Sequence, residues 1–288
     1  MAMAVSLDMR PQTGLGRLCA DRAGDRIVPA PASGGMERIE AWFSGNAYDP
    51  HRHDTYAIGL TIEGVQAFRY RGALRRSLPG QIIVLHPDEV HDGGAATEAG
   101  LRYRMLYLEP SLVAGSLARR GRALPFVRDG VVSDPSFRKT LLGALGSLDA
   151  PMEDLQLDDF LVRLADCLAR HSGEPERPLS RPSLRAAMLA RDHLEANALR
   201  LVRSQELEAV TGMDRFQLAR HFRAVFSTSP HRFQTMRRLQ QARRMIEAGE
   251  ALASVAPATG FSDQSHLNRQ FRKAFGVTPG RWAALVRG

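Results

Sequence analysis

The C-terminal third of the chain contains an internal repeat with an offset of 49 residues. Asp214–Phe233 and Asp263–Trp282 share eight identities in twenty aligned positions. Each copy follows a short helical pattern and a glycine turn, at Gly212 and at Gly260. A short helix, a glycine turn and a longer helix make up the helix-turn-helix pattern. The repeat therefore predicts two such units and an all-α fold for this region.

In each longer helix an apolar stripe is expected to pack inward, which leaves the opposite face exposed. At roughly 100° per residue, the faces opposite the stripes carry arginines at matching positions of the two copies. Arginine can bridge guanine, asparagine can bridge adenine, and aromatic or alanine side chains contact the thymine methyl group. Exposed arginines are often only solvated, but their repetition favours DNA contact. The candidate DNA-binding residues are Phe216, Ala219, Arg220 and Arg223 in the first copy, and Ser265, Asn268, Arg269 and Arg272 in the second.

The charge of the chain supports this interpretation. The 288 residues carry a net charge of +8, but residues 184–288 have a balance of +9 and residues 1–183 a balance of −1. Such asymmetry is typical of a chain whose basic half binds a polyanion. A basic surface that is merely solvated is the alternative.

Composition divides the chain into four segments. Residues 1–35 are rich in Gly, Pro, Ala and Arg without a period, which predicts an irregular arm. Residues 36–171 combine short β-type runs with later helical patterns, which predicts a small all-β barrel or sandwich with added helices. Residues 172–183 are polar and proline-rich, as in a linker, and residues 184–288 are helical throughout. The expected strands are 38–43, 56–63, 66–70, 81–85 and 101–108, and the expected helices of this half follow Pro110 and cover 135–148 and 154–170.

The last of these helices carries one apolar stripe. Leu157, Leu161, Leu164 and Leu168 recur at helical spacing. The stripe can pack on its own barrel, or it can also meet a second subunit in a homodimer. Both possibilities remain open at this stage.

The chain shows no signal for a membrane or for an oxidising compartment. It contains no run of about 18 apolar residues, and Asp8 and Arg10 interrupt the N-terminal stretch. Cys19 and Cys167 are far apart and match neither a disulfide framework nor a metal-ligand spacing. We therefore expect a cytoplasmic protein with no cofactor.

A family resemblance rests on two runs of the C-terminal part. GFSDQSHLNRQFRKAFGVTPGRW (260–282), together with RRLQQARRMIEAG (237–249), closely resembles the signature of AraC-type transcription regulators. The resemblance implies two helix-turn-helix units joined by a long helix over 230–248, with both recognition helices in successive major grooves of DNA. It adds Gln264 to the candidate DNA contacts, and it implies RNA polymerase as a partner.

The N-terminal part resembles a sensor domain. PHRHDTYAIG (50–59) and PGQIIVLHPDEVH (79–91) resemble the two motifs of cupin barrels, which many AraC-type regulators carry. Metal-binding cupins surround an ion with a His-x-His pair, a nearby Glu and a later His. His51, His53 and His91 match three of these places, but no glutamate follows His53 at the required distance.

These histidines have three possible roles. With Tyr56, Tyr70 and Tyr107 they can form a polar pocket for a small-molecule effector, which is our prediction. They can instead bind a metal, since three protein ligands with an open position suffice for Zn²⁺, or they can be structural.

Two other functions compete with a ligand-responsive transcription regulator. A cupin enzyme with an attached nucleic-acid module would need the carboxylate that is missing here. An architectural DNA-binding protein would have no use for the barrel. The sequence therefore predicts a sequence-specific regulator and not an enzyme, and it leaves activation and repression as open alternatives.

Overall fold

The structure is a computed structural model that describes residues 24–118, 124–172 and 181–287. Its N-terminal half contains two antiparallel sheets, with strand orders β1-β2-β9-β4-β7-β10 and β3-β8-β5-β6. The first sheet comprises β1 (Arg26–Pro29), β2 (Met36–Phe43), β4 (Tyr56–Gly64), β7 (Ile82–Leu85), β9 (Leu101–Leu108) and β10 (Val131–Val132). The second comprises β3 (Asn46–His51), β5 (Gln66–Tyr70), β6 (Ala73–Ser77) and β8 (His91–Ala95). The predicted all-β domain is confirmed.

The first residues of the described chain correct one expectation. All five predicted strands are present, but residues 26–29 form β1 and are not part of an irregular arm. Ile27 is buried and pairs with Ala41 of β2. Pairing with β2 supplies the order that the local sequence does not signal. Residues 1–23 of the predicted arm, with Cys19, lie outside the described residues.

Alternation along the strands separates two hydrophobic clusters. In β9, Tyr103 and Met105 belong to one cluster, and Leu106 and Leu108 belong to the other. Successive side chains of a strand point to opposite faces, so the first set lies between the sheets and the second lies outside them. The outer face is covered by α1 (Pro110–Ala118), α2 (Pro135–Leu145) and α3 (Asp154–His171).

The leucine stripe of α3 packs inside its own domain. All four leucines are buried, between 0% and 7% exposed, in the cluster that covers the outer face of the first sheet. This confirms the first of the two alternatives for the stripe. Because those side chains are already buried, the stripe itself cannot form a contact with a second subunit.

The C-terminal half is helical, as predicted. Its helices are α4 (Arg181–Ala196), α5 (Ser204–Thr211), α6 (Arg215–Phe226), α7 (Pro230–Glu247), α8 (Leu252–Ala258), α9 (Gln264–Phe275) and α10 (Pro279–Arg287). The Ser229 hydroxyl accepts a hydrogen bond from the Arg232 N–H, and Pro230 occupies the first turn, where its missing N–H costs nothing. Helix α4 begins within the predicted linker, and residues 173–180 of that linker lie outside the described residues. No helix of the described residues is long and apolar enough to cross a membrane.

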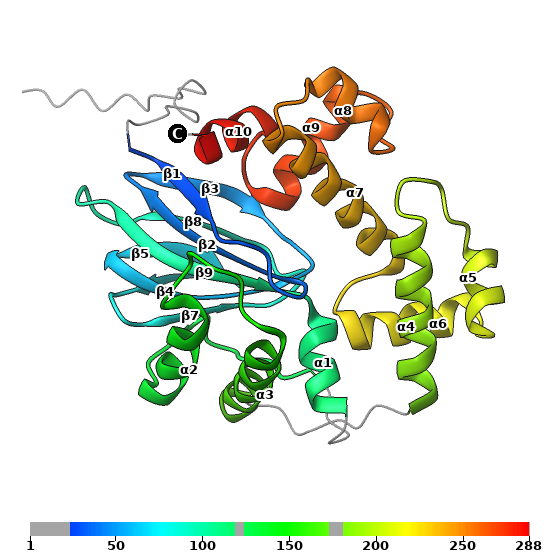
Figure 1. Cartoon of the computed structure of the whole chain (residues 1–288), viewed down its shortest axis with the longest axis horizontal. Helices are drawn as coiled ribbons and strands as arrows, with labels where there is room; N and C mark the ends of the chain where they lie inside the picture. Colours follow the sequence, from blue (N-terminus) through cyan, green and yellow to red (C-terminus); the bar gives the residue numbers. More distant parts are fainter. Residues whose placement is uncertain (1–23, 119–123, 173–180, 288) are drawn as a thin grey trace, which may run out of the picture.

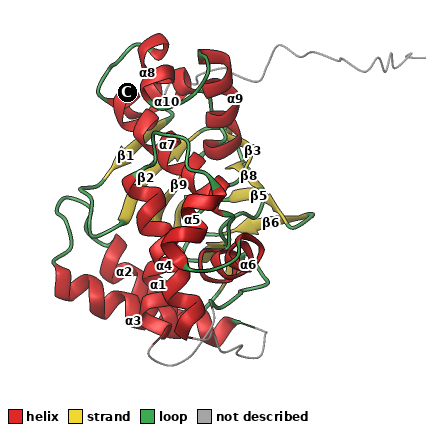
Figure 2. Ribbon diagram, turned by 90° about the vertical axis from the view of Figure 1, so that its right-hand side faces the viewer, coloured by secondary structure: helices red, strands yellow, loops and turns green. Residues whose placement is uncertain are grey.

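The helical half docks on the sheets through a shared apolar core. In Figure 1 its helices surround the upper and right-hand sides of the sheets, and Figure 2 shows this right-hand side face on. Met236 and Leu239 of α7 and Phe271 of α9 belong to the same buried cluster as Phe68 and Tyr103 of the sheets. The two halves therefore share one hydrophobic core and are packed against each other in this arrangement.

A row of ion pairs crosses the same interface. Five arginines of the helical half contact carboxylates of the N-terminal half. The pairs are Arg232–Asp88 at 2.5 Å, Arg237–Asp54 at 2.8 Å, Arg243–Glu37 at 2.6 Å, Arg272–Asp49 at 2.7 Å and Arg281–Asp25 at 3.5 Å. Part of the positive excess of the C-terminal half is thus neutralised within the chain, which the charge balance alone did not reveal.

Arg237 makes the most buried of these contacts. Its side chain is 10% exposed, and it bridges Asp54, which is 2% exposed, and Glu109. Burying an ion pair is costly, but removing one partner costs more because it leaves the other charge unpaired in a dry environment.

We expect Arg237→Met to lower the free energy of unfolding by about 3–5 kcal/mol, because Asp54 would remain buried without its cation. Urea unfolding of the full chain measures this change. The matched control is Arg75→Met, which removes a surface pair with Asp129. The control should cost about 1 kcal/mol or less, and an equally small loss for Arg237→Met would contradict the prediction.

Candidate functional site

Each recognition helix begins at the aspartate that the repeat has in common. The Asp214 side chain accepts hydrogen bonds from the Phe216 and Gln217 N–H groups, and Asp263 accepts one from the His266 N–H. These N-caps fix where α6 and α9 start, and therefore which side chains stand on their first turns. Each helix then buries the expected apolar stripe.

The predicted DNA-binding residues lie on the free faces of these helices. Eight of the nine are exposed, with Phe216 at 64%, and Ala219 is half-buried. Arg220, Arg223 and Arg269 form no ion pair with any described residue. Their positive charges therefore remain available to a polyanion such as DNA, as expected for residues predicted to contact it.

Arg272 is the exception among the candidate arginines. Its guanidinium contacts both sensor and solvent: the side chain is 49% exposed and its Nε donates to the Asp49 carboxylate at 2.8 Å. The end of α9 is fastened to the same segment, because the Asp49 and Arg52 N–H groups donate to the Gly276 and Lys273 carbonyls. Arg272, one of the predicted DNA contacts, is therefore paired with a carboxylate of the N-terminal half in this arrangement.

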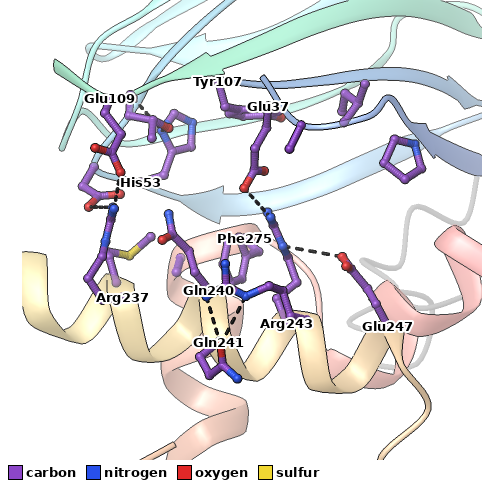
Figure 3. A pocket seen from close by; sticks show the side chains of 18 of the residues that line it. Glu37, His53, Tyr107, Glu109, Arg237, Gln240, Gln241, Arg243, Glu247 and Phe275 are labelled. Carbon is purple, nitrogen blue, oxygen red and sulfur yellow. Dashed lines mark hydrogen bonds and ion pairs between the residues drawn. The ribbon is translucent and has the colours of Figure 1, made fainter. Parts of the chain in front are cut away.

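A cavity of about 750 Å³ lies between the sheets and α7. Figure 3 shows Arg237, Gln240 and Arg243 of α7 directed toward the strands that carry Glu37 and Tyr107. Its apolar lining includes Ile39, Met236, Phe275, Trp282 and Val286. Both halves of the chain supply its walls, so a molecule bound there would contact both.

Five of the six predicted effector residues are divided among three places, and the sixth, His51, lines neither of the two cavities. His53 and Tyr107 line the large cavity, whereas Tyr70 and His91 line a second cavity of about 430 Å³. Tyr56 lies on the outer face of the first sheet, where its hydroxyl donates to the Pro125 carbonyl at 3.3 Å. Its neighbour Ala57 belongs to the inner cluster, as strand alternation requires. The expectation that all six residues surround one pocket is therefore wrong.

Three of these residues do come together. His51, His53 and His91 are buried, and each offers a ring nitrogen within 4.8 Å of those of the other two. Burial, followed by the charge of a neighbouring histidine, lowers the pKa of each imidazole to about 3. The three rings are thus neutral over the whole physiological range, the form that can accept a metal ion.

Sequence reasoning missed the contribution of α7 to the large cavity. Arg237, Gln240, Arg243 and Arg244 line it, as does Glu37 of β2. The family resemblance implied only a connecting role for residues 230–248, between the two helix-turn-helix units. Its arginines, spaced along an otherwise amphipathic helix, were a signal that this helix has a charged partner.

Comparisons with known proteins agree with this architecture. Residues 33–165 match the family profile of the AraC-like ligand binding domain, and residues 207–284 match that of a helix-turn-helix domain. Together the two profiles cover both halves of the chain in the expected order.

Relatives and solved structures extend the match over most of the chain. An uncharacterized HTH-type transcriptional regulator, YbfI of Bacillus subtilis, is 25% identical over 240 residues, which is 80% of this chain and 86% of that protein. The structure of ToxT from Vibrio cholerae has a TM-score of 0.64 at 10% identity and covers 88% of this chain and 100% of that one. ToxT has also been solved bound to an unsaturated fatty acid, with a TM-score of 0.60 at 11% identity, covering 93% of this chain and 98% of that one.

The relative from Bacillus subtilis is an HTH-type transcriptional regulator, and the two profiles are those of a ligand-binding domain and of a helix-turn-helix domain. These findings favour the regulator over the cupin-enzyme alternative. The two profiles place a ligand-binding domain before a helix-turn-helix domain, the order in which the two halves of the chain are arranged. The chain belongs to the AraC-type transcription regulators, with an N-terminal ligand-binding domain and a DNA-binding helix-turn-helix region.

Proposed function

We propose that the effector of this regulator binds in the cavity between the sheets and α7. The supporting observation is that both halves of the chain line this cavity. A molecule that contacts both halves has different affinities for the docked and undocked arrangements, and a ligand can shift a population only through such a difference. Effector binding then changes the fraction of molecules in which the DNA-binding half is docked on the N-terminal half.

The lining supports a ligand with an apolar body and an anionic group. Arg244 donates to the Gln241 side-chain oxygen and forms no ion pair with any described residue. Phe275 and Trp282 supply apolar surface nearby, and the volume lies within the usual range of small-molecule sites. ToxT is solved with an unsaturated fatty acid and with a naphthalenyl butenoic acid, both carboxylates on apolar bodies. We propose an amphipathic carboxylate as the effector class.

Oleate should raise the melting temperature of the full chain in a saturable way, because a ligand of the folded state stabilises it by about 2.7 kcal/mol at 100 times its dissociation constant. Methyl oleate, which lacks the charge, is the matched ligand control and should have little effect. Arg244→Gln should weaken the response to oleate, since this exposed arginine of the lining has no carboxylate partner among the described residues. Equal stabilisation by acid and ester would contradict a carboxylate-specific site.

DNA recognition is proposed to use the free faces of α6 and α9. The contacts would be Phe216, Ala219, Arg220 and Arg223 from α6, and Gln264, Ser265, Asn268, Arg269 and Arg272 from α9. The supporting observations are the exposure of eight of these side chains and the absence of ion pairs at Arg220, Arg223 and Arg269 among the described residues. Arg272 would have to leave Asp49 before it could contact DNA.

Arg269→Ala should weaken binding to the operator by about 1–3 kcal/mol and relax specificity at one base pair, because a bidentate contact with guanine would be lost. Electrophoretic mobility shifts with a selected operator and with single-base variants measure this effect. Arg191→Ala, which changes an arginine already paired with Asp192, is the control and should leave specificity unchanged. An equal loss on operator and random DNA would identify Arg269 as a phosphate contact.

Self-association is proposed to use the outer face of α3, and not the buried stripe. Leu155 and Val162 lie two turns apart on that face and are 82% and 42% exposed. By the family resemblance, we also propose RNA polymerase as a further partner, an activating role, and a cytoplasmic location.

Sedimentation should show a dimer for the wild-type chain and a folded monomer for the double variant Leu155→Glu, Val162→Glu, because two buried carboxylates would oppose the contact. Leu142→Glu on α2, where Leu142 is 48% exposed, is the matched control and should remain dimeric. A monomeric wild-type chain, or a variant with unchanged sedimentation, would exclude this surface.

A further inference from the structure

The two helix-turn-helix units have separate hydrophobic cores. The first unit (α4–α6) is built around a buried cluster that contains Phe222 and Val225 of α6 and Phe233 of α7. The second unit (α8–α10) belongs to another cluster, which takes in Met236 and Leu239 of α7. In Figure 1, α7 runs from the first unit to the second. Because the two clusters share no residue, the mutual orientation of the units depends on α7 and on polar contacts beside it.

Arg238 of α7 lies where the two units meet. Its Nε donates to the Ala198 carbonyl at 2.8 Å and its Nη2 to the Arg200 carbonyl at 2.9 Å, both in the connection between α4 and α5. Its Nη1 donates to the carbonyl of Gly260, in the turn between α8 and α9, at 3.4 Å. A planar fork of five N–H donors can reach several carbonyls from one fixed position. One guanidinium therefore bonds to the backbone of both units.

Gln234, one turn before Arg238 on α7, holds the same connection. Its side chain is 6% exposed, and its amide nitrogen donates to the Asn197 and Arg200 carbonyls at 3.2 and 2.7 Å. These carbonyls follow the C-terminal end of α4, where backbone carbonyls lack the partners that a continuing helix would provide. Gln234 and Arg238 satisfy them from α7, and we call these two side chains the α7 clamp.

The turn at Gly260 lies directly against this connection. Gly260 has a φ of +77°, and a Cβ there would lie 3.0 Å from the Leu199 carbonyl oxygen and 3.4 Å from Nε and Cζ of Arg238. A glycine suits both the backbone angle and the close approach. The first unit, the guanidinium and the second unit are therefore in contact at one point.

Arg238 makes these contacts without a carboxylate partner. Within the described part of the chain it forms no ion pair, and burial lowers the pKa of its guanidinium. Burying a charged group is costly unless hydrogen bonds replace its water. An apolar side chain of similar length would avoid that cost, but directional hydrogen bonds can fix the angle between two backbone segments. The charge is therefore better explained by orientation than by stability.

We propose that Arg238 and Gln234 are positioning residues for DNA recognition, because they set the distance and the angle between α6 and α9. This inference rests on the proposed use of α6 and α9 as reading helices. Two linked binding modules gain most affinity when the linkage matches the separation of their sites, and a looser linkage lowers that gain but tolerates other separations. The α7 clamp therefore makes the spacing between two DNA elements part of the specificity.

Operators with altered spacing test the α7 clamp in the full chain. Footprinting on a selected operator locates the element that each unit protects, and one or two base pairs are then inserted between the elements. Each added base pair moves the second element by about 3.4 Å and turns it by about 35°. We expect one insertion to weaken binding by the wild-type chain at least about thirtyfold, because one of two rigidly held units then loses its base contacts.

Arg238→Met and Gln234→Met should tolerate the insertion. Each removes hydrogen bonds of the α7 clamp but keeps an unbranched side chain, and we expect the insertion to cost either variant less than about fivefold. Binding to the original operator should weaken by about tenfold or less, because the preorganised angle is lost while the base contacts remain. The control is Arg191→Met, since the Arg191 side chain is 22% exposed and pairs with Asp192 inside α4. It should be as strict in spacing as the wild type.

The spacing profile separates the α7 clamp from the reading faces. Footprints locate the two elements whichever side chains contact the bases, so failure of those faces would appear with Arg269→Ala and not here. A wild-type chain that binds every spacing equally would overturn the proposal. A variant whose affinity falls by the same factor at every spacing would show a purely structural role and would overturn it as well. Where Arg238→Met does not fold, Gln234→Met decides.

Discussion

The arrangement of the two halves depends on arginines of the helical half that are paired with carboxylates of the sensor. Arg237 is the central case, since it and Asp54 are almost fully removed from water. Neither charge can stay in the interface without the other, because each would be left unsolvated. The pairs nearer the surface, such as Arg272–Asp49, are more exposed and therefore more sensitive to salt and to competing anions. The ion pair at the centre of the interface therefore holds the two halves together more firmly than the pairs nearer its edge.

This division changes the meaning of the charge asymmetry. A balance of +9 in the last 105 residues suggests a surface made for DNA, yet five of those arginines contact sensor carboxylates. The interface and the proposed DNA contacts have one arginine in common, Arg272, which lies on the exposed face of α9 and is paired with Asp49. A phosphate backbone near α9 would compete with Asp49 for that guanidinium. If Arg272 contacts DNA as proposed, docking and DNA binding compete for this one cation.

The sequence predicted the features that depend on local rules. The repeat located α6 and α9, because its shared aspartates are the N-caps and its shared apolar residues are the buried stripes. Strands β3, β6 and β8 were missed because they are short and contain proline, arginine or glycine instead of alternating apolar residues. Tyr56 was misplaced because grouping residues by type ignored the alternation that puts it on the outer face. The large cavity could not be predicted, since it is formed by contacts between residues about 200 positions apart in the sequence.

One short segment of the sensor connects these observations. Between β3 and β4, Asp49 binds Arg272, His51 touches the end of α9, His53 lines the large cavity, and Asp54 binds Arg237. A molecule in the cavity would contact His53, which lies inside this segment. Asp54 is the next residue after His53 and Asp49 lies four residues before it, so a displacement of the backbone at His53 would act close to both ion pairs. We therefore expect an effector in the cavity to act on α7 and α9 through this segment, because the segment is joined to both helices by ion pairs.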